Sequence, residues 1–165
     1  MSYNVIGVDP GKDGAMALLC DGKLITTSDI PLWNVDGKKC VDPRQLEQDI
    51  EELLAMAEAE NPSGTSIIVL EKAQVMPRQG GASGFEYGRT NGIIEGVCWN
   101  ARVPMYYVRP NNWKKRAKLG KDKDDALDRA RQMFPHLCDE FRRKRDHDRA
   151  EAALIAVYGM PNLVE

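Results

Sequence analysis

The sequence predicts an α/β fold in which helices flank a five-stranded mixed sheet. Three observations lead to this prediction. Three short apolar runs joined by turn signals open the chain, a fourth and almost wholly apolar run follows a helical stretch, and the last third has helical spacing. We expect the first three strands to be antiparallel, and the fourth and fifth to run parallel to the first. Residues 1–165 are expected to form one domain.

The expected strands are short runs rich in apolar and β-branched residues, at 4–8, 14–20, 23–29, 66–71 and 105–108. Asp21 and Gly22 separate the second run from the third, and this dipeptide favours a two-residue hairpin turn. The segment 30–41 contains Pro31 and Gly37 and is expected to be a loop.

The expected helices show apolar residues at helical spacing, at about 43–60, 85–102, 112–119, 122–134 and 148–158. Asp42 and Pro43 start the first of them, as an N-cap followed by a proline in the first turn. A Gly-rich segment, 76–84, precedes the second helix. The order of elements is β-β-β-α-β-α-β-α-α-α.

The composition is that of a soluble globular protein, with 42% hydrophobic and 29% charged residues. No apolar run approaches the ~18–20 residues of a membrane span, and the N-terminus lacks a secretory signal pattern. We therefore expect a cytosolic protein that needs no membrane. The scattered cysteines predict free thiols, mostly in the core, at Cys20, Cys40, Cys98 and Cys138.

The charge is unevenly distributed along the chain. The formal net charge is −2, yet residues 109–149 carry 14 basic and 8 acidic side chains, whereas residues 1–108 carry 9 basic and 15 acidic ones. A basic segment on an acidic body indicates a surface that faces a polyanion. A solvated helical face is the alternative interpretation.

Acidic residues stand at the ends of the apolar elements. Asp9 ends the first strand, Glu71 ends the fourth, and Asp148 and Glu151 lie one turn apart at the start of the last helix. If the first and fourth strands are central neighbours, their last residues meet at one edge of the sheet. The small apolar residues 152–157 indicate that the last helix packs closely on the sheet, with its acids near the other two.

Crowded carboxylates repel each other unless a cation lies between them. Oxygen ligands without a cysteine partner suit Mg²⁺ or Mn²⁺ rather than zinc. Such a set predicts a two-metal site that acts on a phosphodiester. Three of the acids also have a structural explanation: Asp9 as a turn residue, and Asp148 and Glu151 as charges that favour the start of a helix. Glu71 is harder to explain in this way, because a lone acid at the end of a central strand is costly to bury.

Three motifs then resemble those of RuvC-type Holliday junction resolvases: VIGVDPG at 5–11, IIVLEKAQVM at 67–76 and DRAEAALIA at 148–156. The third motif is close to the phage-like branch of that family. The resemblance covers nearly the whole chain. It implies an RNase H-like fold, a homodimer and paired symmetric nicks in four-way and branched DNA that leave 5′-phosphate and 3′-hydroxyl ends.

By position, the resemblance implies two Mg²⁺ ions per active site, replaceable by Mn²⁺, with four catalytic metal ligands at Asp9, Glu71, Asp148 and Glu151. Glu151 stands where an aspartate is more usual, so the resemblance leaves open whether it binds directly or through water. It also leaves open whether Asp146 or His147 joins the site. The expected DNA contacts combine basic and aromatic residues, at Lys114, Lys115, Lys118, Lys121, Lys123, Arg145, Phe85 and Tyr87.

Three other functions compete with this one. The first is another RNase H-like nuclease that acts on RNA–DNA hybrids, flaps or single strands. The second is a nucleotide-binding protein of the actin and sugar-kinase type, because Asp9 to Gly14 fits its phosphate loop. Such kinases need two such domains and more than twice this length. The third is a junction-binding module without activity, for which a set of carboxylates has no use.

Overall fold

The computed structural model describes residues 1–74, 80–120, 122 and 124–160. Its main sheet has five strands, β1 (Tyr3–Asp9), β2 (Ala15–Cys20), β3 (Lys23–Asp29), β6 (Thr65–Glu71) and β7 (Met105–Val108). Their order across the sheet is β3-β2-β1-β6-β7. β1 is antiparallel to β2 and parallel to β6, and β7 is parallel to β6. The expected mixed sheet is confirmed, with the first and fourth predicted strands as central neighbours.

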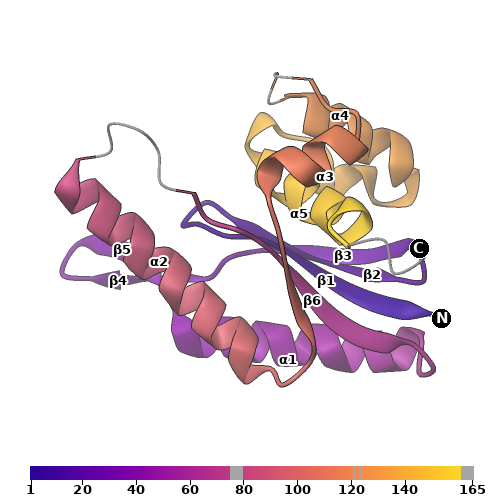
Figure 1. The fold of residues 1–165 in the computed structure, drawn as a ribbon, viewed down its shortest axis with the longest axis horizontal. Coiled ribbons are helices and arrows are strands. Elements are labelled where there is room, and N and C mark those ends of the chain that lie inside the picture. The colour runs from indigo at the N-terminus through magenta and orange to yellow at the C-terminus, as the bar shows by residue number, and fades with distance from the viewer. Residues whose placement is uncertain (75–79, 121, 123, 161–165) are drawn as a thin grey trace.

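Helices cover both faces of this sheet (Figure 1). They are α1 (Pro43–Glu60), α2 (Gly81–Asn100), α3 (Pro110–Arg116), α4 (Asp124–Met133) and α5 (His147–Tyr158). Alternate residues of β1 point to opposite faces. Val5 joins the hydrophobic core that includes α4 and α5, whereas Ile6 and Val8 join the core that includes α1 and α2. β1 is therefore buried from both sides, as its apolar sequence predicts.

The segment 30–41 was expected to be a loop, and this prediction is wrong. It forms a second sheet, the hairpin of β4 (Leu32–Val35) and β5 (Lys38–Val41). Asp36 and Gly37 make its turn with φ of 50° and 79°, close to the 48° and 81° of the Asp21–Gly22 turn. Both dipeptides adopt the left-handed backbone that two-residue hairpins need, so the signal was present in the sequence.

The ends of several helices differ from the prediction. α2 begins at Gly81, four residues before the expected start, and α3 begins at Pro110, where a proline fits the first turn. The stretch between α4 and α5 holds two 3₁₀ helices that the apolar spacing does not reveal, η1 (Pro135–Phe141) and η2 (Lys144–Asp146). The cap of α1 is confirmed, since the Asp42 side chain accepts hydrogen bonds from the amides of Arg44 and Gln45.

Two further expectations concern membrane-spanning segments and the thiols. None of the helices in the described part of the chain combines the length and apolar character that a membrane crossing requires. All four cysteines are free thiols, as expected. Cys20 and Cys98 lie in the core, Cys40 is half-buried and Cys138 is exposed, so half of them are core residues.

Candidate active site

Asp9, the last residue of β1, is buried, with 7% of its surface exposed. Its pKa lies well above the ordinary value, first because of burial and then because of the negative charges of Glu151, Glu71 and Asp148. Lys114 acts in the opposite direction. Three further carboxyl groups, one at the end of β6 and two at the start of α5, are therefore near enough to Asp9 to raise its pKa. That these four acids are catalytic metal ligands stays a prediction.

The backbone after Asp9 is compact. Gly11 has φ of +147°, and the amide of Gly14 donates to the carbonyl of Gly11 at 3.2 Å. A Cβ on Gly14 would lie 2.2 Å from the Asp9 carbonyl oxygen. Any side chain at position 14 would therefore disturb the end of β1 and with it the position of the Asp9 carboxyl group.

Glu71 ends β6 beside Asp9, because the parallel register pairs Val8 with Leu70. The indole Nε1 of Trp113, which is fully buried, donates to Glu71 Oε2 at 2.6 Å. Burial raises the pKa of Glu71. The hydrogen bond from Trp113 lowers it, and the charge of Glu151 raises it further, with a net rise. Trp113 thus fixes the orientation of a carboxyl group that remains costly to ionise.

Close packing of α5 on β1 brings the helical acids to this point. A Cβ on Gly7 would lie 2.3 Å from the carbonyl oxygen of Ala152 and 2.6 Å from the amide nitrogen of Ala156. The helix and the strand can approach this closely only because Gly7 has no side chain and the facing helix residues are alanines. As a result, the start of α5 is held against the carboxyl ends of β1 and β6.

At the start of α5, Asp148 and Glu151 have different partners. Nε2 of His147 lies 3.1 Å from Asp148 Oδ1. Glu151 Oε1 accepts a hydrogen bond of 2.8 Å from the ammonium of Lys114. Both acidic side chains are 19% exposed, so they lie at the rim of the site rather than beneath it.

Lys114 was predicted as a phosphate contact, and the structure gives it a partner inside the acidic group. Burial alone would lower the pKa of Lys114, but the hydrogen bond to Glu151 and the charges of Glu151, Glu71 and Asp9 raise it. The sequence did not indicate the roles of Trp113 and Lys114. One signal was available: α3 directly follows β7, the neighbour of β6, so its first residues must lie near the end of β6.

Asp146 lies apart from the acidic group. It is 2% exposed and accepts hydrogen bonds from the Arg143 side chain at 2.8 and 3.0 Å and from the Arg143 amide at 2.7 Å. Burial would raise the pKa of Asp146, but these hydrogen bonds lower it below its ordinary value. Asp146 therefore closes the single turn of η2 directly before α5.

The donor chemistry fits a hard divalent cation, since all four acids offer oxygen and their repulsion is what such a cation relieves. Within the described part of the chain, however, no three His, Cys, Asp or Glu side chains are placed to hold one ion. The side chains of Glu71 and Glu151 are instead engaged by Trp113 and Lys114. These hydrogen bonds engage one oxygen of each carboxylate, and the second oxygens, Glu71 Oε1 and Glu151 Oε2, are the ones that would ligate a cation.

A cleft of about 820 Å³ opens beside Asp148, between the β4–β5 hairpin, the turn after β1 and η2. Four cationic side chains line it, Lys12, Lys39, Arg143 and Arg145. Arg145 was predicted to contact DNA, whereas Lys39 belongs to the hairpin that the sequence analysis missed. Within the described residues, no ion pair involves Lys39 or Arg145.

The other predicted DNA contacts are dispersed. Lys115 and Lys118 are exposed on and after α3. Phe85 is 70% exposed on α2, and Tyr87 is half-buried one turn before Asn91. Lys121 and Lys123 lie outside the described residues.

The sheet order, the helices on both faces and the acids at one sheet edge define an RNase H-like α/β fold. The chain is similar to solved structures of RuvC from Thermus thermophilus. One of them, RuvC in complex with Holliday junction substrate, is 18% identical with a TM-score of 0.61, over 95% of this chain and 94% of that one. The other, a structure of RuvC, is 15% identical with a TM-score of 0.52, over 95% of this chain and 97% of that one. No protein-family model matches the chain, and no curated protein matches its sequence.

Proposed function

We propose that this protein is a divalent-metal-dependent endonuclease that cuts branched DNA, a RuvC-type resolvase of the phage-like branch. One observation carries the proposal: Asp9, Glu71, Asp148 and Glu151 converge where β1 and β6 end, in a fold shared with RuvC. The solved RuvC structure to which this chain is similar over 95% of its length is a complex with Holliday junction substrate. The DRAEAALIA motif at 148–156 supports the phage-like branch.

Asp9, Glu71, Asp148 and Glu151 would hold two Mg²⁺ ions, or Mn²⁺ in their place. When bound, the ions supply charge stabilisation for in-line hydrolysis of a phosphodiester to 5′-phosphate and 3′-hydroxyl ends. The chain contributes orientation: Trp113 holds Glu71, and the end of β1 fixes Asp9. Lys114 keeps a positive charge among the acids, which favours the approach of a phosphate to an otherwise negative site.

The cleft beside Asp148 supplies a path for the DNA backbone. Arg145 and Lys39 are exposed cations without ion pairs in the described structure, so they are available to phosphates. Such contacts position the substrate without reading its sequence. Lys115, Lys118, Lys121 and Lys123 would extend this basic surface, and Phe85 and Tyr87 would stack on bases that are unpaired at the branch point.

A homodimer completes the proposal, because paired nicks need two active sites on one junction. The exposed side of α2 supports it. Trp99 is 55% exposed there and would supply an apolar contact between the two chains. Sedimentation equilibrium measures the number of chains. The dimer would be contradicted if the free protein had the mass of one chain and the complex had the mass of one chain plus one junction.

The deciding experiment compares a labelled four-way junction, a linear duplex and an RNA–DNA hybrid, each with Mg²⁺ or EDTA. We expect paired nicks in the junction that disappear with EDTA. Cutting of the hybrid alone would favour the RNase H-like alternative. Equal cutting of the linear duplex would contradict the resolvase assignment but leave the nuclease assignment intact.

Two conservative variants test the acids in the same assay. Asp9→Asn and Glu71→Gln should lose cleavage by at least about 100-fold, because even groups that only support metal ligands are worth 10–100-fold. Both variants should still bind the junction, since neither residue is a phosphate contact. Junction binding is measured by gel shift in EDTA. Variants that cut at the normal rate would contradict the metal-ligand assignment.

A further inference from the structure

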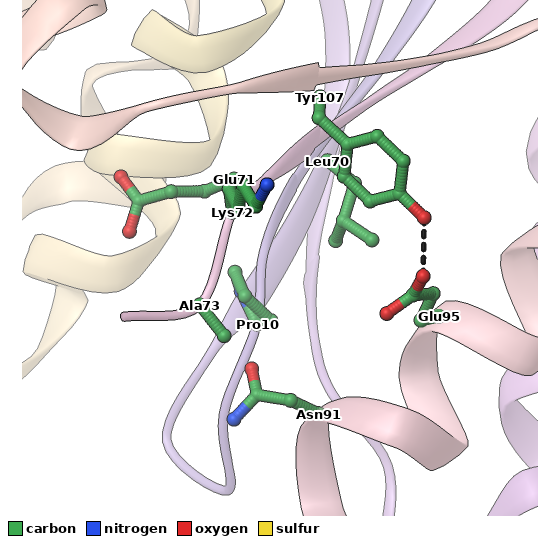
Figure 2. Close-up of a pocket in the computed structure, with 8 residues that line it drawn as sticks. All are labelled: Pro10, Leu70, Glu71, Lys72, Ala73, Asn91, Glu95 and Tyr107. Carbon is green, nitrogen blue, oxygen red and sulfur yellow. Dashed lines mark hydrogen bonds between the residues drawn. The ribbon is translucent and has the colours of Figure 1, made fainter. Parts of the chain in front are cut away.

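A pocket of about 310 Å³ lies on the other side of the strand end from the acidic group. It is bounded by the end of β6, by β7 and by α2, and Pro10 and Leu70 form part of its apolar wall. Figure 2 shows that the Glu71 carboxyl group points away from this pocket, whereas Glu95 and Tyr107 face it. Glu71 itself lines the pocket and Pro10 follows Asp9, so the pocket adjoins both acidic strand ends.

Asn91 places a buried acceptor at this pocket. It is 8% exposed, and its Oδ1 has no hydrogen-bond partner. The orientation of the amide is fixed, because Nδ2 donates to the carbonyl of Tyr87 at 2.8 Å. In Figure 2 the Asn91 oxygen points toward Pro10 and Ala73, into the pocket. A buried acceptor without a donor costs stability, which is a reason to expect a ligand that supplies the donor.

Glu95 and Tyr107 form the opposite wall. The Tyr107 hydroxyl donates to Glu95 Oε1 and accepts from Trp99 Nε1 at 3.2 Å, so the ring is held by two hydrogen bonds. The ring remains 43% exposed. In the described structure Glu95 Oε2 takes no hydrogen bond, and Figure 2 shows this oxygen directed away from Tyr107 toward the pocket. The pocket therefore combines a fixed aromatic ring with two acceptor oxygens, and Lys72 also lines it.

We propose that this pocket binds an unpaired nucleobase that presents amino hydrogens, namely adenine, cytosine or guanine. The inference rests on the proposed function, because it needs a nucleic acid at the neighbouring acidic site. Asn91 Oδ1 and Glu95 Oε2 are acceptors, so they favour a base edge with an amino group, whereas thymine donates only through one ring N–H that lies between two carbonyl oxygens. Tyr107 and the apolar wall suit the face of a planar ring.

The test uses a four-way junction in which each adenine near the branch point is replaced in turn by purine deoxyribonucleotide, which lacks only the amino group. Affinity is measured in EDTA, so that cleavage is not required. For the normal protein we expect one position at which the replacement weakens binding about three- to tenfold, as for a lost hydrogen bond to a buried acceptor. The Asn91→Leu variant should lose this difference.

Two further variants complete the test. Glu95→Gln keeps the shape of the wall but replaces an acceptor by an amide, and it should reduce the same difference even if Asn91→Leu folds poorly. Thr90→Val is the matched control, because Thr90 is a buried polar neighbour on α2 that does not line the pocket; it should keep the difference. If the protein binds junctions but no adenine replacement changes its affinity, the pocket assignment alone is overturned. Failure to bind any junction overturns the proposed function as well.

Discussion

At the scale of single residues, the acidic site is a conflict between burial and charge. Asp9 lies in the sheet where a carboxylate is costly, and three further acids increase that cost. Lys114 and Trp113 offset part of it through Glu151 and Glu71. Buried carboxylates that repel one another do not stabilise the fold, so their presence together indicates a functional site.

This conflict predicts a pH-dependent stability in the absence of metal. The raised pKa of Asp9 means that the folded state holds its proton more tightly than the unfolded chain, so stability falls as pH rises from the unfolded pKa toward the folded one. In EDTA, Asp9→Asn should therefore be more stable than the normal protein at pH 7, by about 1–3 kcal/mol. The difference should vanish near pH 3.

Urea unfolding at both pH values measures this effect, and Mg²⁺ supplies the control. Added Mg²⁺ should stabilise the normal protein and leave Asp9→Asn nearly unchanged, because a ligand stabilises only the state that binds it. An Asp9→Asn variant that is less stable than the normal protein in EDTA at pH 7 would show that the buried carboxylate has a favourable partner.

At the scale of elements, apolar periodicity predicted all five strands of the main sheet and all five α-helices. The prediction failed where the apolar pattern is irregular or too short to show a period. The hairpin of β4 and β5 has exposed lysines and an exposed Trp33, so its pattern does not alternate cleanly. The two 3₁₀ helices are too short for periodicity. The contacts of Trp113 and Lys114 with the acids join residues more than 35 positions apart, and no local pattern reports such a pair.

The close packing of α5 on β1 predicts that one methyl group added at Gly7 lowers both stability and cleavage. Gly7→Ala would place a Cβ 2.3 Å from the Ala152 carbonyl, so α5 must move and carry Asp148 and Glu151 away from Asp9. We expect a loss of about 1–3 kcal/mol in the free energy of unfolding, as for other overpacked cores, together with reduced cleavage. Gly84→Ala is the control, because nothing lies within 4 Å of its added methyl group. Equal stability of the two variants would contradict the close-packing argument.

The hairpin provides a matched pair of lysines. Lys39 lines the cleft beside Asp148, whereas Lys38, its neighbour along β5, points to the opposite face of the strand and does not line it. Lys39→Ala should weaken junction binding and reduce the slope of log K against log salt by about 1, as for one lost phosphate contact. Lys38→Ala should change neither. Equal effects of the two variants would show that the hairpin contributes general charge only.

At the scale of the whole molecule, the positions of the charges indicate affinity for DNA better than the net charge does. The net charge of −2 suggests no affinity for DNA. The fold gathers acids where β1 and β6 end, and it brings cations of the hairpin and η2 to the adjoining cleft, where four aspartates also lie. The asymmetry along the sequence predicted the basic 109–149 segment. It could not predict Lys12 and Lys39, which join the cleft only through the fold.

A dimer with one active site per chain predicts how mixtures of normal and inactive protein behave. If normal protein and Asp9→Asn are unfolded and refolded together in equal amounts, about half of the dimers should carry one active site, as random pairing of two subunits requires. On a closed circular cruciform, such dimers should leave a nicked circle, whereas normal dimers give a linear product by cutting both strands. We therefore expect nicked circles to accumulate in the refolded mixture and to remain few when the two proteins are refolded separately and then combined. A monomeric enzyme would give the same products in both cases, and the proposal of a two-site resolvase would then fail while single-strand nicking by the acidic site would stand.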